Sequence, residues 1–299
     1  MSESLDPSSY RELLRRFLAE DFGAGDITTN TIVDAGRRAR GQLIAKAPLG
    51  LVLAGVELFL EVFRLLEPAV EAQIGRKDGD ELRPGESPVQ VFASARTLLS
   101  GERVALNLLQ RLSGIATLTR RFVREVEGTD AQILDTRKTT PGLRALEKYA
   151  VRVGGGRSHR KSLAEAVLIK ENHIRMAGGV AAALRAAQPA QGRVAWMEIE
   201  VTNLDELRDA LVYRPDDYRP DVILLDNMQP ADIRCAVEQA RRAEDAQNAP
   251  AKKILLEASG GITLANVRQF AETGVDWISV GALTHSAPAV DLSFEIEPV

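Results

Sequence analysis

The strongest constraint on the fold is a regular alternation of short apolar segments and helical patterns in the second half of the chain. Six apolar segments have the pattern of strands, at residues 132–137, 166–170, 195–201, 221–226, 253–258 and 276–281. Stretches with helical periodicity separate them, at residues 143–153, 180–187, 204–212, 231–242 and 264–273. Apolar strands that alternate with helices are typical of a parallel sheet. The pattern predicts a β/α barrel and favours a closed barrel over an open sheet.

The first part of the chain has a different rhythm. Between about residues 41 and 100 it has short strand patterns and turns, interrupted by one helical pattern at 55–66. This mixture is typical of an α+β sandwich. A long helical pattern then covers residues 102–126 and leads into the alternating part.

The end of the chain is expected to return to the N-terminal part. Residues 290–296 alternate apolar and polar side chains, as an edge strand does. We therefore predict an N-terminal α/β sandwich domain from residues 1–112, joined by the tail 287–299. The β/α barrel catalytic domain is expected at residues 113–286.

Positive charge collects where the first predicted strand of the barrel ends. The stretch Leu134–Gly142 (LDTRKTTPG) passes from an apolar strand directly into Arg137 and Lys138 and then into a Pro-Gly turn. Between residues 135 and 175, ten lysines and arginines oppose four acids, a local balance of +6, although the formal net charge of the chain is −4. This concentration predicts a small, multiply anionic substrate.

Other polar residues also fall at predicted strand ends, where the active sites of β/α barrels lie. They are Lys170, Glu200, Asp226, the turn Ser259-Gly260-Gly261 and the turn Ser279-Val280-Gly281. Small turns after the last two strands expose backbone N–H groups beside a helix N-terminus, an arrangement that suits a phosphate. The pattern therefore predicts a phosphate site there.

Composition excludes several other classes. The longest apolar stretch, residues 49–66, is interrupted by Glu57, Glu61 and Arg64, so no membrane span is expected. The acidic start lacks the apolar core of a signal peptide. The single cysteine, Cys235, excludes an internal disulfide and is expected to be buried or inert. The mildly acidic balance disfavours nucleic-acid binding. A cytoplasmic location is expected.

Each candidate residue also has an ordinary structural interpretation. In the ordinary interpretation Arg137 and Lys138 are a solvated surface pair, but such a pair rarely follows a buried strand directly. His159 alone would be a loop histidine, yet its basic neighbours favour an anion pocket. Asp226 would cap the next helix. Glu198 and Glu200 point the same way because they are two residues apart, and Glu200 is preferred only because it lies nearer the strand end.

His173 and His285 follow predicted strands as well. Hydrogen bonding within the fold is the favoured role for both.

Longer motifs resemble those of a known family. They are Asp26–Thr29, Leu134–Gly142, Glu147–Val151, Gly154–Gly156, His159-Arg160, Leu168–Ile174, Glu198–Val201, Leu224–Met228, Glu257–Ile262 and Ser279–His285. Together they resemble quinolinate phosphoribosyltransferase, the carboxylating nicotinate-nucleotide pyrophosphorylase family of NAD biosynthesis. The resemblance covers almost the whole chain. One departure is the longer connection Tyr213–Pro220, which is expected to be a surface loop.

The resemblance implies an N-terminal α+β open sandwich followed by an incomplete β/α barrel, with the phosphate site at the C-terminal ends of the last strands. It implies transfer of phosphoribose from phosphoribosyl pyrophosphate (PRPP) to quinolinate. Carbon dioxide and pyrophosphate are lost, and nicotinate mononucleotide results. It also implies a homodimer in which Arg103 is supplied across the interface, and Mg²⁺ as cofactor.

The resemblance further assigns roles to single residues. Arg137, His159 and Arg160 are expected to clamp the two carboxylates of quinolinate. Lys138 and Lys170 are expected to bridge quinolinate and PRPP.

Two acids complete the expected site. Glu200 and Asp226 are expected near the ribose hydroxyls and Mg²⁺, in part through water. The residues with an expected catalytic role are Lys138, Lys170, Glu200 and Asp226. The full set expected to bind substrate is Arg103, Thr136, Arg137, Lys138, His159, Arg160, Lys170, Glu200, Asp226, Ser259, Gly260, Gly261, Ser279, Val280 and Gly281.

Two other functions compete with this one. A related phosphoribosyltransferase would act on nicotinate or another acid, although three cationic groups favour a dicarboxylate. A Schiff-base lyase or aldolase would use Lys170, which then has to be desolvated. A non-catalytic metabolite-binding protein is disfavoured, since the acids and cations of a full site are all present.

Overall fold

The computed structural model describes residues 5–213, 219–245 and 253–299, and the chain divides into two compact units. The first unit contains Met1–Arg120, Thr139–Gly155 and Leu283–Val299; the second contains Arg121–Lys138 and Gly156–Ala282. The expected boundary at 112/113 differs from this division, because residues 113–120 and 139–155 group with the first unit. Helix α4, Ala95–Glu125, is continuous through residue 113, so no break in the chain occurs there.

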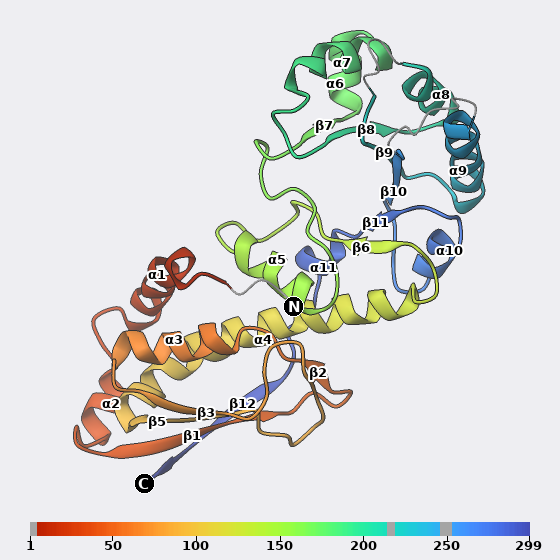
Figure 1. Ribbon diagram of the computed structural model, residues 1–299. Helices are drawn as coiled ribbons and strands as arrows, with labels where there is room; N and C mark the ends of the chain where they lie inside the picture. Colours follow the sequence, from red (N-terminus) through yellow and green to blue (C-terminus); the bar gives the residue numbers. More distant parts are fainter. Residues whose placement is uncertain (1–4, 214–218, 246–252) are drawn as a thin grey trace. The chain divides into compact units, whose positions relative to one another are not determined.

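The first unit is built on a four-stranded antiparallel sheet in the order β12-β1-β5-β3. These strands are β1 (Arg38–Ala45), β3 (Glu71–Ile74), β5 (Val89–Ser94) and β12 (Leu292–Pro298). A short ribbon pairs β2 (Leu51–Val52) with β4 (Glu81–Leu82). Because β12 is the edge strand beside β1, the chain end returns to the N-terminal sheet as predicted (Figure 1).

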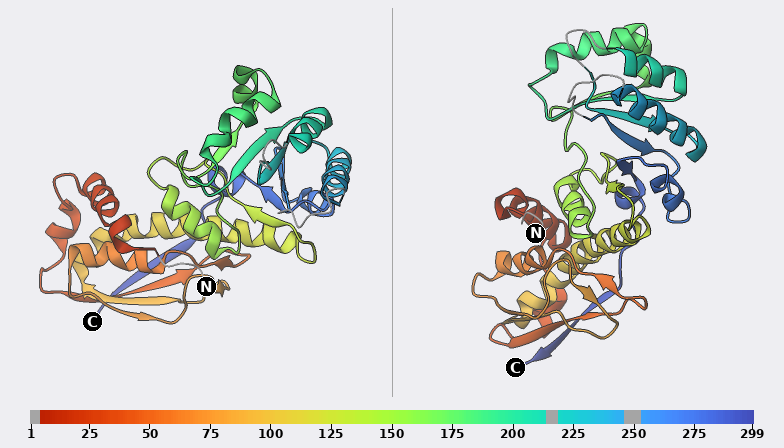
Figure 2. Two further views of the ribbon diagram at one scale, coloured as in Figure 1. Left: turned by 45° about the horizontal axis from the view of Figure 1, so that its top comes forward. Right: turned by 45° about the vertical axis from the view of Figure 1, so that its right-hand side comes forward.

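Helices complete the first unit. They are η1 (Pro7–Ser9), α1 (Arg11–Phe22), α2 (Ile27–Ile32), α3 (Val56–Leu66), α5 (Arg144–Val153) and most of α4. Helix α3 lies on one face of the sheet (Figures 1 and 2). Aromatic side chains of the helix and of β12 form a cluster. The ring of Phe294 from β12 lies 5.5 Å from the rings of Phe59 and Phe63. Gly41 makes room for Phe294, since a Cβ there would lie 2.0 Å from that ring.

The second unit contains the predicted parallel sheet. Its six strands are β6 (Gln132–Leu134), β7 (Val167–Ile169), β8 (Met197–Val201), β9 (Val222–Asp226), β10 (Leu255–Ser259) and β11 (Trp277–Ser279). Their order is β6-β11-β10-β9-β8-β7, and every neighbouring pair is parallel. Within the described residues the outer strands β6 and β7 do not pair with each other. The closed barrel favoured by the strand pattern is therefore wrong, and the incomplete barrel is confirmed.

Helices follow the strands of this sheet (Figure 2). They are α6 (Glu171–Ala177), α7 (Val180–Ala187), η2 (Gln188–Ala190), α8 (Leu204–Val212), α9 (Pro230–Asp245) and α10 (Val267–Ala271); α11 (Ala282–His285) follows β11. Cys235 on α9 is exposed, so the expectation of burial is wrong. Residues 214–218 of the expected surface loop lie outside the described residues. No helix among the described residues has the length and apolar character needed to cross a membrane.

Candidate active site

A pocket of about 310 Å³ lies at the C-terminal ends of the strands of the second unit. Its walls are formed by Thr136, Arg137, Lys138, His159, Arg160, Leu168, Lys170, Glu200, Leu224, Asp226, Glu257, Ser259 and Ser279. Ten of these residues were predicted from the sequence as site residues. The structure therefore brings together side chains that lie between residues 136 and 279 of the chain.

The parallel register explains how the strands place these residues. Glu200 pairs with Leu224, and Leu224 pairs with Glu257, so the three occupy one level of the sheet. Ser259 pairs with both Asp226 and Ser279 at the next level toward the strand ends. Because side chains alternate between the two faces of a strand, all six point to the same face.

Five predicted site residues do not line this pocket. Gly260 and Gly261 line a separate cavity of the second unit, and Val280 and Gly281 line neither. Arg103 belongs to the first unit, where it is exposed on α4 and lines a pocket of about 520 Å³. Their predicted roles stay predictions.

The predicted phosphate turns have different local structures. Gly260 and Gly261 both have positive φ, and a Cβ at Gly260 would lie 2.1 Å from the Asn227 side chain, so the first turn requires glycine. Helix α10 begins only at Val267, and residues 262–266 separate it from the pair, so its N-terminus does not directly follow the turn. Helix α11 begins directly after Gly281.

The guanidinium group of Arg160 is held in the pocket by a backbone carbonyl group. Arg160 donates to the carbonyl oxygen of Ala166 at 2.8 Å and is 5% exposed. Burial, and then the positive charge of Arg137, lower the pKa of Arg160, while Glu198 opposes them. Two guanidinium groups that repel each other in a partly buried pocket are stabilised when an anion binds between them. This arrangement suits a carboxylate ligand.

Lys170 and Glu200 form an ion pair inside the pocket. The Glu200 side chain is 11% exposed and the Lys170 side chain is 48% exposed. Lys170 is also the N-cap residue of α6, and its backbone N–H donates to Nδ1 of His173 at 2.9 Å. His173 therefore stabilises the start of α6, as expected for a structural role.

Asp226 is not the cap of the following helix. Helix α9 begins at Pro230, so its N-cap position is residue 229. The side-chain amide of Asn227 donates to Oδ2 of Asp226 at 2.7 Å. Asn227 is also a non-glycine residue with positive φ, 55°, and this turn leaves Asp226 in the pocket wall.

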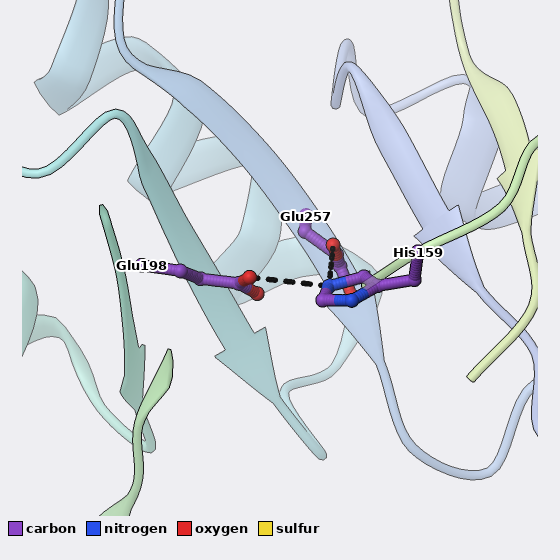
Figure 3. A group of neighbouring side chains, drawn as sticks. All are labelled: His159, Glu198 and Glu257. Atoms are coloured by element: carbon purple, nitrogen blue, oxygen red, sulfur yellow. Dashed lines mark ion pairs between the residues drawn. The ribbon is translucent and has the colours of Figure 1, made fainter. Parts of the chain in front are cut away.

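Glu198 and Glu200 have different surroundings despite sharing a face. Glu200 lines the pocket, whereas Glu198 is 1% exposed and does not line it. Oε2 of Glu198 lies 3.1 Å from Nε2 of His159, and Oε2 of Glu257 lies 3.4 Å from the same nitrogen (Figure 3). Glu257 was not predicted as a site residue, because it lies within an apolar strand pattern.

His159 lines the pocket, but both of its ring nitrogens contact protein groups. Nε2 faces the two glutamates, and Nδ1 accepts the backbone N–H of Arg160 at 2.8 Å. The backbone N–H of His159 donates to Asp135 at 2.8 Å, which fixes the loop. A direct clamp on a substrate carboxylate would require one of these ring contacts to open.

Comparison with known proteins places this site in a family. The model of the quinolinate phosphoribosyl transferase C-terminal domain matches residues 115–295, and that of the N-terminal domain matches residues 26–113. The chain belongs to the quinolinate phosphoribosyltransferase family. Among its relatives in this family, the carboxylating nicotinate-nucleotide pyrophosphorylase of Mycobacterium leprae is 43% identical over 291 residues, 96% of each chain.

Two further comparisons agree with the family. The probable carboxylating nicotinate-nucleotide pyrophosphorylase of Bacillus subtilis is 42% identical over 286 residues, 96% of this chain and 93% of that one. The crystal structure of NadC from Streptococcus pyogenes superposes with a TM-score of 0.90 at 37% identity, covering 100% of both chains. The expected fold and family resemblance are confirmed.

Proposed function

We propose that this quinolinate phosphoribosyltransferase transfers phosphoribose from PRPP to the ring nitrogen of quinolinate. The carboxylate beside that nitrogen leaves as carbon dioxide, and the products are nicotinate mononucleotide and pyrophosphate, a step of de novo NAD biosynthesis. The observation that carries the proposal is one pocket that combines Arg137 and Arg160 with the carboxylates of Glu200 and Asp226. The family membership supports it.

The basic end of the pocket suits a planar dicarboxylate. Guanidinium groups match carboxylates in two-point contacts, and both Arg137 and Arg160 line the wall. Nicotinate has one carboxylate and would leave part of this charge unmatched. Quinolinate has two and is therefore the better fit.

The acidic part of the pocket fits a magnesium-bound pyrophosphate donor. Glu200 and Asp226 offer the oxygen ligands that Mg²⁺ prefers, and this ion commonly keeps part of its water shell. When bound, Mg²⁺ neutralises charge on the departing pyrophosphate. We further propose that Lys138 and Lys170 hold the anionic groups of both substrates. The Ser259–Gly261 and Ser279–Gly281 turns would receive the 5-phosphate.

The pocket residues support bond cleavage through charge. Breaking the bond at the anomeric carbon develops positive charge on the ribose, which the carboxylates of Glu200 and Asp226 stabilise. After transfer the pyridine nitrogen is cationic, and it stabilises negative charge on the adjacent carbon when carbon dioxide leaves. Both steps depend on fixed charges in one pocket.

We also propose a homodimer in which Arg103 acts in the site of the partner subunit. Arg103 is exposed on α4 of the first unit, so its side chain is available to another chain. The expected cytoplasmic location stays a prediction.

Asp226→Asn is expected to raise the Mg²⁺ concentration needed for half-maximal rate by about tenfold or more, because one anionic oxygen ligand is lost. The rate is measured at fixed substrate over a magnesium series. Asp232→Asn, an exposed acid in the first turn of α9, is the matched control and should keep the wild-type requirement. An unchanged requirement in Asp226→Asn would remove Asp226 from the metal site.

Binding distinguishes quinolinate from nicotinate without turnover. Calorimetry is expected to give a dissociation constant at least about tenfold lower for quinolinate, since the second carboxylate adds charged hydrogen bonds worth roughly 1.5–3 kcal/mol. Equal affinities would favour a sister enzyme that uses nicotinate.

A Schiff-base enzyme is less consistent with the pocket. Its lysine has to be desolvated, whereas the Lys170 side chain is 48% exposed and paired with Glu200. Borohydride trapping of a carbonyl substrate on Lys170 would revive this alternative.

A further inference from the structure

Three ionisable side chains form a buried cluster at the pocket (Figure 3). His159, Glu198 and Glu257 are 7%, 1% and 1% exposed. Nε2 of His159 lies 3.1 Å from Oε2 of Glu198 and 3.4 Å from Oε2 of Glu257. Of the two acids, only Glu257 lines the pocket. One ring nitrogen therefore lies close to two buried carboxylates.

The hydrogen bonds of His159 indicate which ring nitrogen carries its hydrogen. Nδ1 accepts the backbone N–H of Arg160, so in this arrangement Nε2 carries the hydrogen. That hydrogen is directed to Glu198, which also accepts from Nε1 of Trp196 at 3.0 Å. Among the described residues, neither oxygen of Glu257 has a hydrogen-bond donor in suitable geometry. Glu257 is therefore the carboxylate that lacks stabilisation as an anion.

The electrostatics agree with this assignment. Burial, and then the negative charge of Glu198, raise the pKa of Glu257, while His159 and Ser279 offset part of the effect. Burial lowers the pKa of His159, but the two glutamates outweigh it and raise that pKa to about 10. Both shifts favour an additional proton on the cluster, which the three coupled groups share. The bond from Arg160 to Nδ1 assigns this proton to Glu257.

The same three atoms have the spacing of a metal site, since they lie within 4.8 Å of one another. A metal on Nε2 would need hydrogen on Nδ1, directed to an acceptor. Here Nδ1 faces a backbone N–H donor instead. The cluster is therefore built for a proton rather than a metal.

The proposed reaction needs a proton donor at the ring carbon from which carbon dioxide leaves. The ring carbon that loses carbon dioxide has to gain hydrogen, and Lys170 in the same pocket is already paired with Glu200. Glu257 is an acid of the pocket wall, at the level of the sheet shared with Glu200 and Leu224.

We propose that Glu257 is the general acid that protonates this ring carbon. The inference rests on the proposed function and adds a catalytic residue to it. The bond between the ring carbon and its carboxylate breaks, carbon dioxide leaves, and the electron pair stays on the carbon. That carbon takes the proton of Glu257, a C–H bond forms, and Glu257 becomes a carboxylate. Solvent restores its proton before the next turnover.

Glu257→Gln tests the role, because glutamine keeps the size but cannot donate this proton. In a single turnover with quinolinate and PRPP, pyrophosphate should appear at close to the wild-type rate. Nicotinate mononucleotide should form about 100-fold more slowly or worse, the usual range for losing a general acid. Because carbon dioxide recombines with an unprotonated carbanion, quinolinate mononucleotide should accumulate. Equal slowing of both products, or no slowing of either, would overturn the proposal.

Glu198→Gln is the matched control. It makes the same substitution in the same cluster, but at a residue that does not line the pocket. Pyrophosphate and nicotinate mononucleotide should then still form at equal rates. Accumulation of quinolinate mononucleotide in this variant as well would overturn the assignment to Glu257.

The pH profile gives a readout in the unchanged protein. The groups facing Glu257 are Glu198 from β8, Ser279 from β11 and His159. As pH rises through the raised pKa of Glu257, nicotinate mononucleotide formation should fall while pyrophosphate release does not. Parallel profiles would contradict the proposal. No pyrophosphate from wild-type protein would instead reject the proposed function itself, so the two failures are distinguishable.

Discussion

Arg137→Ala is expected to lower kcat/KM for quinolinate. The loss should correspond to about 2–5 kcal/mol of transition-state stabilisation, the cost of removing one partner from a buried charged contact. Arg137 lies three residues after the last residue of β6 and lines the pocket together with Arg160. A bound carboxylate would lose its two-point partner and would keep an incompletely matched charge. The KM for PRPP at saturating quinolinate should stay close to the wild-type value, since Arg137 is assigned to the other substrate.

Two further variants sharpen this result. Arg137→Lys keeps the charge but loses the planar two-point geometry, so its loss should be intermediate. Arg175→Ala is the matched control, because Arg175 is 61% exposed on α6, pairs with Glu171 and does not line the pocket. Unchanged kinetics for quinolinate in Arg137→Ala would refute the carboxylate clamp.

Glu147→Ala is expected to lower the free energy of unfolding by about 3–5 kcal/mol, as breaking a buried ion pair does. Glu147 is 0% exposed on α5 of the first unit and accepts from Arg111 at 2.9 and 3.2 Å. It also accepts from the backbone N–H and the hydroxyl of Thr140, at 3.1 and 2.8 Å. Alanine would leave these donors without their shared acceptor.

Denaturant unfolding measures this effect as a shift of the midpoint at constant slope. The matched control is Glu171→Ala, which removes an exposed i,i+4 pair with Arg175 and should cost about 0–1 kcal/mol. Equal midpoints for the two variants would show that Glu147 contributes no more than a surface acid. The result separates a structural role from a substrate role for this residue of the family motif.

The sequence predicted most of the pocket because strand ends are local features. Arg137, Lys170, Asp226 and Ser259 each follow or end an apolar segment, and parallel strands bring such ends to one edge. The incomplete barrel was predicted only through the family resemblance. An alternating pattern specifies strands and helices, but it does not show whether β6 and β7 pair.

The rest depends on contacts between distant segments. Pleating placed Glu198 and Glu200 on one face, but only the position of His159 separates a buried acid from a pocket acid. Glu257 was missed because its partners lie on β8 and in the loop of His159, far away in the chain. The role of Glu147 likewise depends on Arg111, which precedes it by 36 residues. Single-sequence patterns carry no information on such pairs.

The central claim is tested most directly by turnover of the purified protein with quinolinate, PRPP and Mg²⁺, with nicotinate in a parallel reaction. Nicotinate mononucleotide, pyrophosphate and carbon dioxide should form in equal amounts from quinolinate, and no product should form from nicotinate. Product from nicotinate without carbon dioxide, or no turnover of either acid by folded protein, would contradict the assignment of the pocket to a dicarboxylate.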